Sequence, residues 1–197
     1  MFFALPGWFG HHQGGGNNAT GAPLDGGLLA LLAAGGVTYY LGRKNKKKMY
    51  TKEFEIRWSD IDANRHLANT AYVNFMSHTR MAFLMENGFG QEDLARENIG
   101  PVVFYEHIYY FKEVFAGKPI KVTLQLKGLA EDGMYFEFLH NFYDENGQNF
   151  ASCEMMGAWI DLKERKLTKL PEALRDNLDS LSHTYDFKIL TKEDTRK

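Results

Sequence analysis

Residues 56–72, with the sequence IRWSDIDANRHLANTAY, contain the side chains best suited to chemistry in this chain. Two carboxylates, Asp60 and Asp62, follow a short strand pattern, and His66 and Asn69 stand just before a helical pattern. A carboxylate near a helix N-terminus can activate water or attack a carbonyl directly, while free backbone N–H groups stabilise the charge that develops on the oxygen. These residues therefore suit the hydrolysis of an activated acyl group.

Local patterns predict the elements that position these residues. Residues 53–58 alternate between apolar and charged side chains, which predicts a half-buried strand. Residues 59–69 form a polar loop, and residues 70–87 carry a wide apolar stripe at helical spacing. Gly88 suits the left-handed position after a helix C-terminus. We expect a strand, a loop that carries the polar cluster, and a long helix covered on most sides.

The rest of the chain predicts strands separated by turns. Asn146-Gly147 is a hairpin signal, and the last strand is apolar on both faces, as in an interior strand. The expected strands are 102–114, 120–127, 134–144 and 148–161, followed by a short helix at 171–181. This order predicts an α+β protein with the hotdog fold, a five-stranded, mostly antiparallel sheet wrapped around a central helix.

Composition divides the chain into unequal parts. Residues 1–48 hold 11 of the 19 glycines, five basic residues and one acidic residue. The remaining residues carry 18 basic and 24 acidic side chains, so they have no basic surplus for a nucleic-acid backbone. The single cysteine, Cys153, excludes an internal disulfide, and its apolar neighbours favour an inert core thiol.

The N-terminal part contains an uncharged run, residues 26–42, followed by the basic cluster RKNKKK. The run is at the short end of what spans a bilayer, and the basic flank predicts a cytoplasmic folded domain. We therefore expect a Gly-rich leader at 1–48 that contains a transmembrane segment at 26–42. A catalytic domain at 49–181 and a C-terminal tail at 182–197 follow it. The alternative is a soluble cytoplasmic protein whose translation starts at Met49.

About residues 50–170 resemble acyl-CoA thioesterases of the hotdog superfamily, of the 4-hydroxybenzoyl-CoA thioesterase type. The family's opening pattern is an aromatic residue, Asp-x-Asp, a His four residues later, Asn residues and a Tyr on the helix. Here it reads Trp58, Asp60, Asp62, His66, Asn69 and Tyr72. Two positions depart from the family: Arg65 stands where glycine is frequent, and Ala68 where asparagine is frequent.

The resemblance implies a role for each of these residues. Asp62 is the expected general base or nucleophile, and the backbone N–H at Asn69 is expected to polarise the thioester carbonyl. His66 is a third candidate catalytic residue. Candidate substrate-binding residues are Tyr72, Asp60, Tyr105 and His107. Structural alternatives stand beside these roles, because an aspartate can hold a loop through backbone N–H groups and a tyrosine or histidine can fill a core.

The implied reaction converts an acyl-CoA to a free acid and CoA, in a homodimer or homotetramer and with no cofactor. No metal site is expected, because His78, His107 and His140 are dispersed over different predicted elements. Two other functions stay open: an enoyl-CoA hydratase-like hotdog enzyme, and a non-catalytic acyl-binding module. The sequence leaves the acyl group, and the choice between base and nucleophile for Asp62, undecided.

Overall fold

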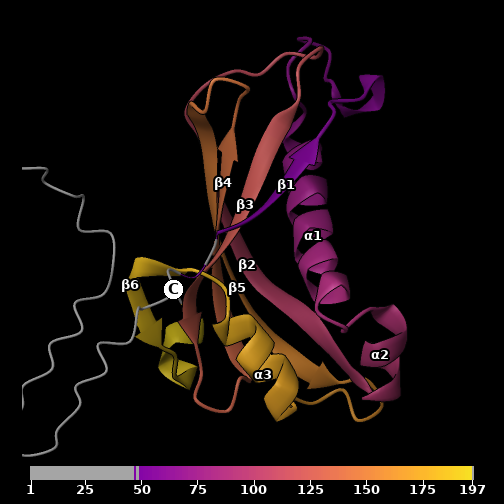
Figure 1. The fold of residues 1–197 in the computed structure, drawn as a ribbon, viewed down its shortest axis with the longest axis vertical. Helices are drawn as coiled ribbons and strands as arrows, with labels where there is room; N and C mark the ends of the chain where they lie inside the picture. Colours follow the sequence, from indigo (N-terminus) through magenta and orange to yellow (C-terminus); the bar gives the residue numbers. More distant parts are fainter. Residues whose placement is uncertain (1–46, 48, 197) are drawn as a thin grey trace, which may run out of the picture. The chain divides into compact units, whose positions relative to one another are not determined.

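The computed structural model describes Lys47 and residues 49–196. Figure 1 shows the elements in chain order. The strands are β1 (Tyr50–Phe54), β2 (Ile99–Tyr110), β3 (Ile120–Leu129), β4 (Tyr135–Tyr143), β5 (Asn149–Asp161) and β6 (His183–Ile189). The helices are α1 (Asn69–Glu86), α2 (Gln91–Arg96) and α3 (Glu172–Asp179), with short 3-10 turns at Trp58–Asp60 and Lys192–Thr195.

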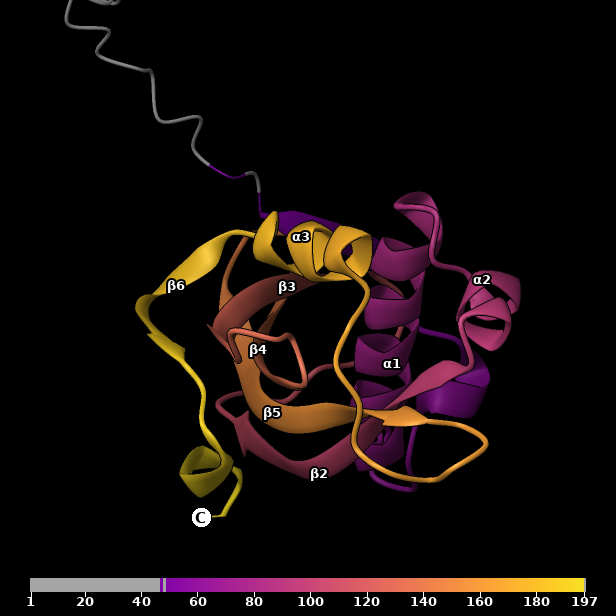
Figure 2. The same cartoon turned by 90° about the horizontal axis from the view of Figure 1, so that it is seen from below.

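The strands form one sheet in the order β1-β3-β4-β5-β2, and all four pairings along this path are antiparallel. β6 pairs in parallel with β3. Seen from below, the sheet curves around one side of α1 (Figure 2). In this view α3 lies next to β3 and α1. β5 is an interior strand, as its two apolar faces predicted. The predicted α+β hotdog fold is confirmed.

The core lies between α1 and the face of the sheet turned toward it. Alternate residues of each strand point inward because successive side chains of a strand face opposite sides. On β4 the inward set is Phe136, Phe138, His140 and Phe142, all buried. The inward face of α1 contributes Ala71, Tyr72, Phe75, Met76, Thr79, Phe83 and Leu84. Burial of this apolar surface, at about 25 cal/mol per Å², is the main stabilising term that holds the helix on the sheet.

The first strand differs from the prediction. β1 ends at Phe54, and Trp58, expected on the buried face of a strand, is 86% exposed. The backbone N–H of Arg57 donates to Asp60 Oδ2 at 2.8 Å, which turns the chain into a 3-10 helix at that point. β1 loses its partner at Phe54, which pairs with Ile120, the first residue of β3, and the local hydrogen bond sets the conformation of residues 57–60 beyond it.

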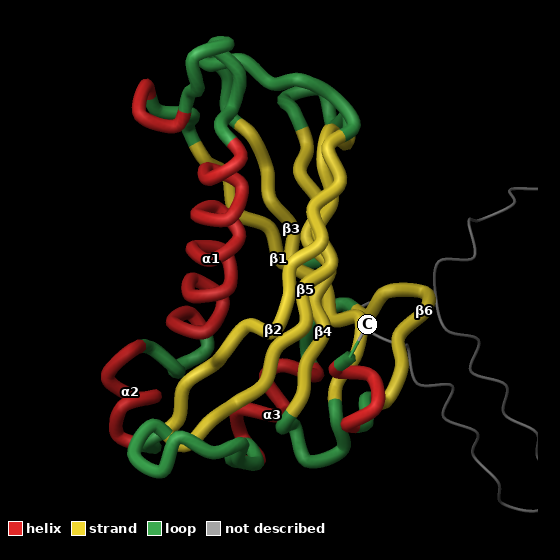
Figure 3. Tube along the Cα trace, turned by 180° about the vertical axis from the view of Figure 1, so that it is seen from behind, coloured by secondary structure: helices red, strands yellow, loops and turns green. Residues whose placement is uncertain are grey.

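The expected tail at 182–197 contains a strand. β6, labelled in Figure 3, pairs with the same edge of β3 that β1 occupies further along. Leu190 packs with Ala130 and Met156 in a second, smaller cluster. The strand was not predicted because charged residues outnumber the few apolar residues that hold this segment on the sheet. The six-residue helix α2 was also absent from the prediction, because so short a helix leaves almost no periodic pattern.

The predicted membrane-anchored localisation is corrected. Within Lys47 and residues 49–196, no helix is long and apolar enough to cross a membrane. The run at 26–42 that suggested the anchor lies outside the described residues.

Candidate functional site

A tight turn fixes Asp62 within the loop of residues 60–69, which we call the aspartate loop. Asp62 Oδ1 accepts hydrogen bonds from the backbone N–H groups of Asn64, at 2.8 Å, and His66, at 3.0 Å. Arg65 closes the turn with a φ of 66°, in the left-handed region that favours glycine. Glycine is frequent at this position in the family that the sequence resembles. Here Arg65 adopts the left-handed conformation that glycine favours.

The two oxygens of Asp62 differ in their surroundings. Oδ1 is engaged by the turn, whereas Oδ2 has no hydrogen-bond partner among the described residues. The side chain is exposed to solvent. The loop thus presents a carboxylate whose position is set by one oxygen while the other is open to water or a ligand.

Asp60, two residues earlier, is in the opposite situation. It is 7% exposed, and its Oδ2 accepts from the backbone N–H of Arg57 at 2.8 Å and from Arg57 Nε at 3.3 Å. Its carbonyl oxygen accepts the N–H of Ala68 at 2.8 Å, which joins the two ends of the aspartate loop. These bonds favour a structural role for Asp60, while its predicted contact with substrate stays a prediction.

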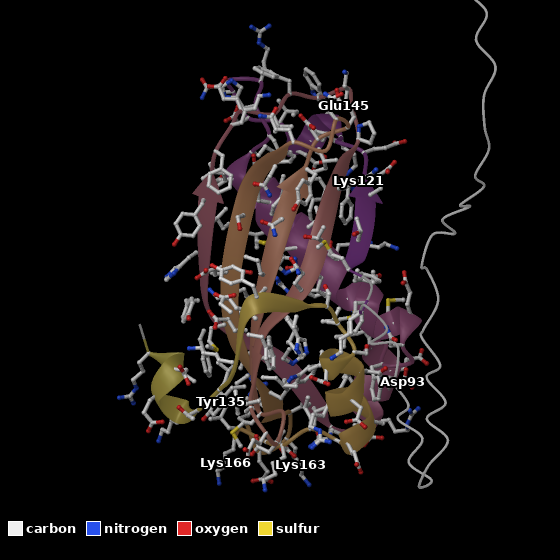
Figure 4. The ribbon with its side chains drawn as sticks, turned by 60° about the vertical axis from the view of Figure 1, so that its left-hand side comes forward. Asp93, Lys121, Tyr135, Glu145, Lys163 and Lys166 are labelled. Atoms are coloured by element: carbon white, nitrogen blue, oxygen red, sulfur yellow. The ribbon has the colours of Figure 1, made fainter. Side chains whose placement is uncertain are left out.

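His66 connects the aspartate loop to the segment after β2. Its Nε2 lies 3.6 Å from Glu113 Oε2, and its ring meets the ring of Phe115 edge-on at 5.0 Å. Phe115 borders a surface groove together with Glu145, which Figure 4 labels at this end of the sheet. Asp62 accepts the backbone N–H of His66, but no hydrogen bond joins the imidazole to Asp62 within residues 49–196.

The helix α1 begins at Asn69, directly after the aspartate loop. Asn69 Oδ1 accepts the N–H of Thr70 at 2.9 Å, and the N–H of Ala71 bonds the carbonyl oxygen of Ala68. The N–H of Asn69 itself has no acceptor in the described part of the chain. A free N–H at the positive end of a helix dipole is a ready site for a developing negative charge.

The other predicted site residues lie away from this loop. Tyr72 is 3% exposed and packs edge-on against Tyr110 and Phe142 within the core, where burial raises its pKa to about 12. Tyr105 and His107 are stacked at 4.7 Å, and Tyr105 packs against the smaller cluster of Leu190. The structure therefore separates the predicted pocket residues onto two faces of the sheet, and their contact with substrate stays a prediction.

A largely buried polar group joins the middle of α1 to the sheet and was not predicted. Arg80 Nη2 is 3.4 Å from Glu106 Oε1 on β2, and Arg80 Nη1 is 3.3 Å from His140 Nε2 on β4. His140 is fully buried, with Nδ1 2.9 Å from the carbonyl oxygen of Thr123. The imidazole is therefore neutral, donating from Nδ1 and accepting at Nε2. Burial, and then the guanidinium, lower the pKa of His140 to about 3.

Sequence reasoning missed Glu113 and Phe115 as neighbours of His66. Both lie almost 50 positions after His66 in the sequence. An isolated antiparallel β-bridge between His66 and Phe115 brings the two segments together. The alternation of β2 carried a usable signal for Glu106, because a charged residue on an inward-facing position requires a partner.

Residues 56–178 match the thioesterase-like superfamily. An Agrobacterium fabrum protein described as L-carnitine dehydrogenase/betainyl-CoA thioesterase is 26% identical over 122 residues, which are 62% of this chain and 25% of that protein. The chloroplastic acyl-acyl carrier protein thioesterase ATL3 of Arabidopsis thaliana is 21% identical over 134 residues, 68% of this chain and 70% of that protein. The chain thus spans only about a quarter of the first relative.

Solved structures give the same fold. A Staphylococcus aureus protein solved in complex with CoA has a TM-score of 0.64 at 19% identity, over 76% of this chain and 92% of that protein. A 1,4-dihydroxy-2-naphthoyl-CoA thioesterase from Synechocystis has a TM-score of 0.61 at 16% identity, over 70% of this chain and 100% of that one. The predicted enzyme class, a thioesterase, is confirmed at the level of the family. The superfamily match covers well over half of the sequence, so the chain belongs to the thioesterase-like superfamily.

Proposed function

We propose that the protein hydrolyses an acyl-CoA thioester to a carboxylic acid and CoA, with Asp62 and the N-terminus of α1 as the reacting surface. The observation that carries the proposal is the pairing of a fixed carboxylate, with Oδ2 open, and an unpaired N–H at Asn69. The turn supplies the fixed position that positioned acid–base chemistry needs. The proposed thioesterase domain, expected at residues 49–181, extends through β6, because β6 pairs with β3 in the same sheet.

The reaction follows from these two groups. Asp62 removes a proton from water, the water oxygen bonds to the carbonyl carbon, and the N–H of Asn69 donates to the resulting oxyanion. The carbon–sulfur bond then breaks, and the proton passes to the departing CoA thiolate. In the alternative route Asp62 attacks the carbonyl itself and expels the CoA thiolate, and water then hydrolyses the mixed anhydride to the acid, which frees Asp62 and supplies the proton for the thiolate. His66, held against Glu113, orients the loop in either route.

The identity of the carrier is part of the proposal. One relative is described as a betainyl-CoA thioesterase and the other as an acyl-acyl carrier protein thioesterase. We favour CoA because one structural relative was solved with CoA and the other is described as a CoA thioesterase. The resemblance to the 4-hydroxybenzoyl-CoA type remains a prediction.

The free edge of β2 favours a homodimer. Among the described residues β2 ends the sheet, and Phe104, Tyr109 and Tyr110 along it are exposed to about half of their surface. An exposed, largely apolar edge strand is a template for pairing with another chain. We infer that two copies join antiparallel through β2, and a homotetramer would be a pair of such dimers.

The test is CoA release by the purified protein over short-chain, long-chain and aromatic acyl-CoAs, with Asp62→Asn as the matched variant. Asparagine keeps Oδ1 for the turn but cannot act as a base, so we expect kcat to fall by at least about 10²-fold. Turnover of acyl-CoA with normal kcat in the variant would contradict the role of Asp62. Binding of an acyl-CoA without any hydrolysis would instead identify an acyl-binding module.

A further inference from the structure

An apolar cavity of about 210 Å³ lies between α1, the inner face of the sheet and α3. Its deeper wall is formed by Leu84, Phe136, Phe138, Met155, Trp159 and Leu178. All six of these side chains are buried. Ser77 and Arg80 are the polar side chains at its border, and Arg80 is held by Glu106. The cavity therefore suits an uncharged, largely apolar group: an ionised ligand would lose its hydration there, and the indole N–H of Trp159 is the one wall donor that lacks a partner among the described residues.

Within one chain, the cavity and the aspartate loop lie at different levels along α1. Arg80 follows Asn69 by eleven residues, which corresponds to roughly 16 Å of helix at 1.5 Å per residue. Tyr72, which packs on Tyr110, lies on α1 between the loop and the cavity, and Arg80 is at the border of the cavity. An acyl group held at the loop of a chain would have to extend over most of this length of helix to reach the cavity of the same chain.

The cavity is bordered by the free edge of β2. Pro101 and Val103, near the start of β2, line it, and Val103 is 48% exposed. When two strands pair antiparallel, the start of each lies beside the end of the other. The chain that follows β2 leads to Phe115, whose ring contacts His66 of the aspartate loop. In the proposed dimer, the aspartate loop of one copy thus faces the cavity of the other.

The wall of the cavity leaves little room to expand. A Cβ placed on Gly157 would lie 2.5 Å from Phe136 Cζ, so the ring of Phe136 is tightly held against β5. Tyr135, which begins β4 next to Phe136, lies toward the opposite end of the sheet from Glu145 in Figure 4, so the cavity is at the far end from the groove beside His66. Because such tightly packed walls cannot move apart easily, each methylene added beyond the available volume costs binding free energy.

We infer that this cavity receives the acyl group of the substrate and limits it to about eight carbon atoms, whether a straight chain or a single aromatic ring. A core cavity of ~150 Å³ holds a benzene molecule, and scaling by volume gives the limit of about eight carbons. The substrate class is then short- to medium-chain or monocyclic aryl thioesters, and long-chain fatty acyl thioesters are excluded. This inference rests on the proposed thioesterase function and on the proposed dimer.

The first test is kcat/KM for straight-chain acyl-CoAs from four to sixteen carbons. Each methylene that enters the cavity should raise kcat/KM roughly fourfold. We expect the rise to stop near eight carbons and kcat/KM to fall beyond about ten. An unbroken rise up to sixteen carbons, or no dependence on length, would overturn the size limit.

Substitutions that change the cavity should move this optimum. Ser77→Phe adds bulk at the border on an exposed helix position and should shift the optimum to shorter chains. Leu178→Ala removes bulk from the deep wall and should extend it by about two carbons. Met85→Phe, on the same helix but outside the cavity, is the control and should leave the profile unchanged. An unaltered profile in Ser77→Phe would refute the assignment even if Leu178→Ala fails to fold.

A binding experiment separates this inference from the proposed function. S-alkyl-CoA thioethers cannot be hydrolysed, so their affinity for Asp62→Asn, measured by calorimetry, reports the cavity without any turnover. A length limit near eight carbons that shifts in Asp62→Asn/Ser77→Phe supports the cavity even if the wild type hydrolyses no thioester. Hydrolysis together with thioether affinity that ignores length, or ignores Ser77→Phe, would reject the cavity and leave the thioesterase proposal standing.

Discussion

Two polar regions of the protein use charge in opposite ways. The aspartate loop is at the surface, and backbone N–H groups hold one oxygen of Asp62 while the other stays open. The group of Arg80, Glu106 and His140 lies between α1 and the sheet, His140 is its fully buried member, and each of the three has a protein partner. The comparison teaches that burial and charge alone do not mark a reacting site. Our proposal rests instead on a carboxylate oxygen that has no hydrogen-bond partner among the described residues and is held in place by its neighbour oxygen.

The largest expected effect comes from removing the oxyanion donor of the loop. Asn69→Pro deletes its backbone N–H, and proline is well tolerated at the first position of a helix. The preceding residue, Ala68, already has the extended conformation, with ψ at 144°, that proline requires of its neighbour. We expect kcat to fall by about 10²–10³-fold with little change in the unfolding midpoint.

The control for this prediction is Asn69→Ala, which removes the side chain but keeps the N–H. It should cost roughly 1 kcal/mol of folding stability or less, through the lost hydrogen bond to Thr70, and leave kcat within a few-fold. Equal kcat in the proline and alanine variants would show that this N–H takes no part in the reaction.

Substitutions in the group of Arg80, Glu106 and His140 should change the free energy of unfolding. Arg80→Met leaves Glu106, whose side chain is 18% exposed, without its partner, and we expect a loss of roughly 2 kcal/mol in the free energy of unfolding. The double variant Arg80→Met/Glu106→Leu removes both charges and should recover most of that loss. Chemical denaturation of the three proteins measures the effect, and a double variant no more stable than the single one would contradict the account.

His140 should make stability depend on pH. Its pKa is about 3 in the folded protein and about 6.5 when exposed, so only the unfolded chain takes up a proton between these values. Stability is therefore fully present above pH 6.5 and falls as the pH drops, by roughly 2 kcal/mol at pH 5. Denaturation of the wild type and His140→Gln at pH 7.5 and 5 checks this.

The comparison variant for His140 is His78→Gln, whose imidazole is exposed on α1. It should retain the full loss of stability between pH 7.5 and 5, whereas His140→Gln should lose most of it. The same slope in both variants would assign the pH dependence to other groups.

The smallest effect concerns Cys153. The thiol is fully buried, and burial raises its pKa to about 12, so almost no thiolate exists at pH 8. Because the thiolate is the reactive form, iodoacetamide should leave kcat of the native protein unchanged and modify the chain only after unfolding. Rapid alkylation of the folded protein, detected by mass spectrometry, would show that the interior opens.

Much of this organisation was predictable from the sequence. The apolar stripe of 70–87 predicted α1, and the alternation of 120–127 predicted β3, each to within a few residues. Both elements turn one side to the core, so apolar residues recur with the helical period in α1 and with a period of two in β3. Trp58 was misplaced because the pairing of β1 with β3 ends at Phe54, and the hydrogen bond from Arg57 to Asp60 turns the chain beyond that point. Such local competition is invisible to a period-two pattern.

The site was predictable only where its residues are close in sequence. Asp62, His66 and Asn69 lie on one loop, so their proximity follows from spacing. The neighbours of His66 on the segment after β2, and the pair of Arg80 with Glu106, depend on how distant elements pack. That packing is set by the sheet register, which no short motif encodes.

The most direct test of this contrast measures kcat and the free energy of unfolding for Asp62→Asn and Asp60→Asn side by side. Asp62→Asn should lower kcat by at least about 10²-fold with stability within about 0.5 kcal/mol of the wild type. Asp60→Asn should lose about 1–3 kcal/mol of stability, because its buried carboxylate accepts two hydrogen bonds from Arg57. Normal kcat in Asp62→Asn, or a loss of activity confined to Asp60→Asn, would contradict the assignment of chemistry to the open carboxylate.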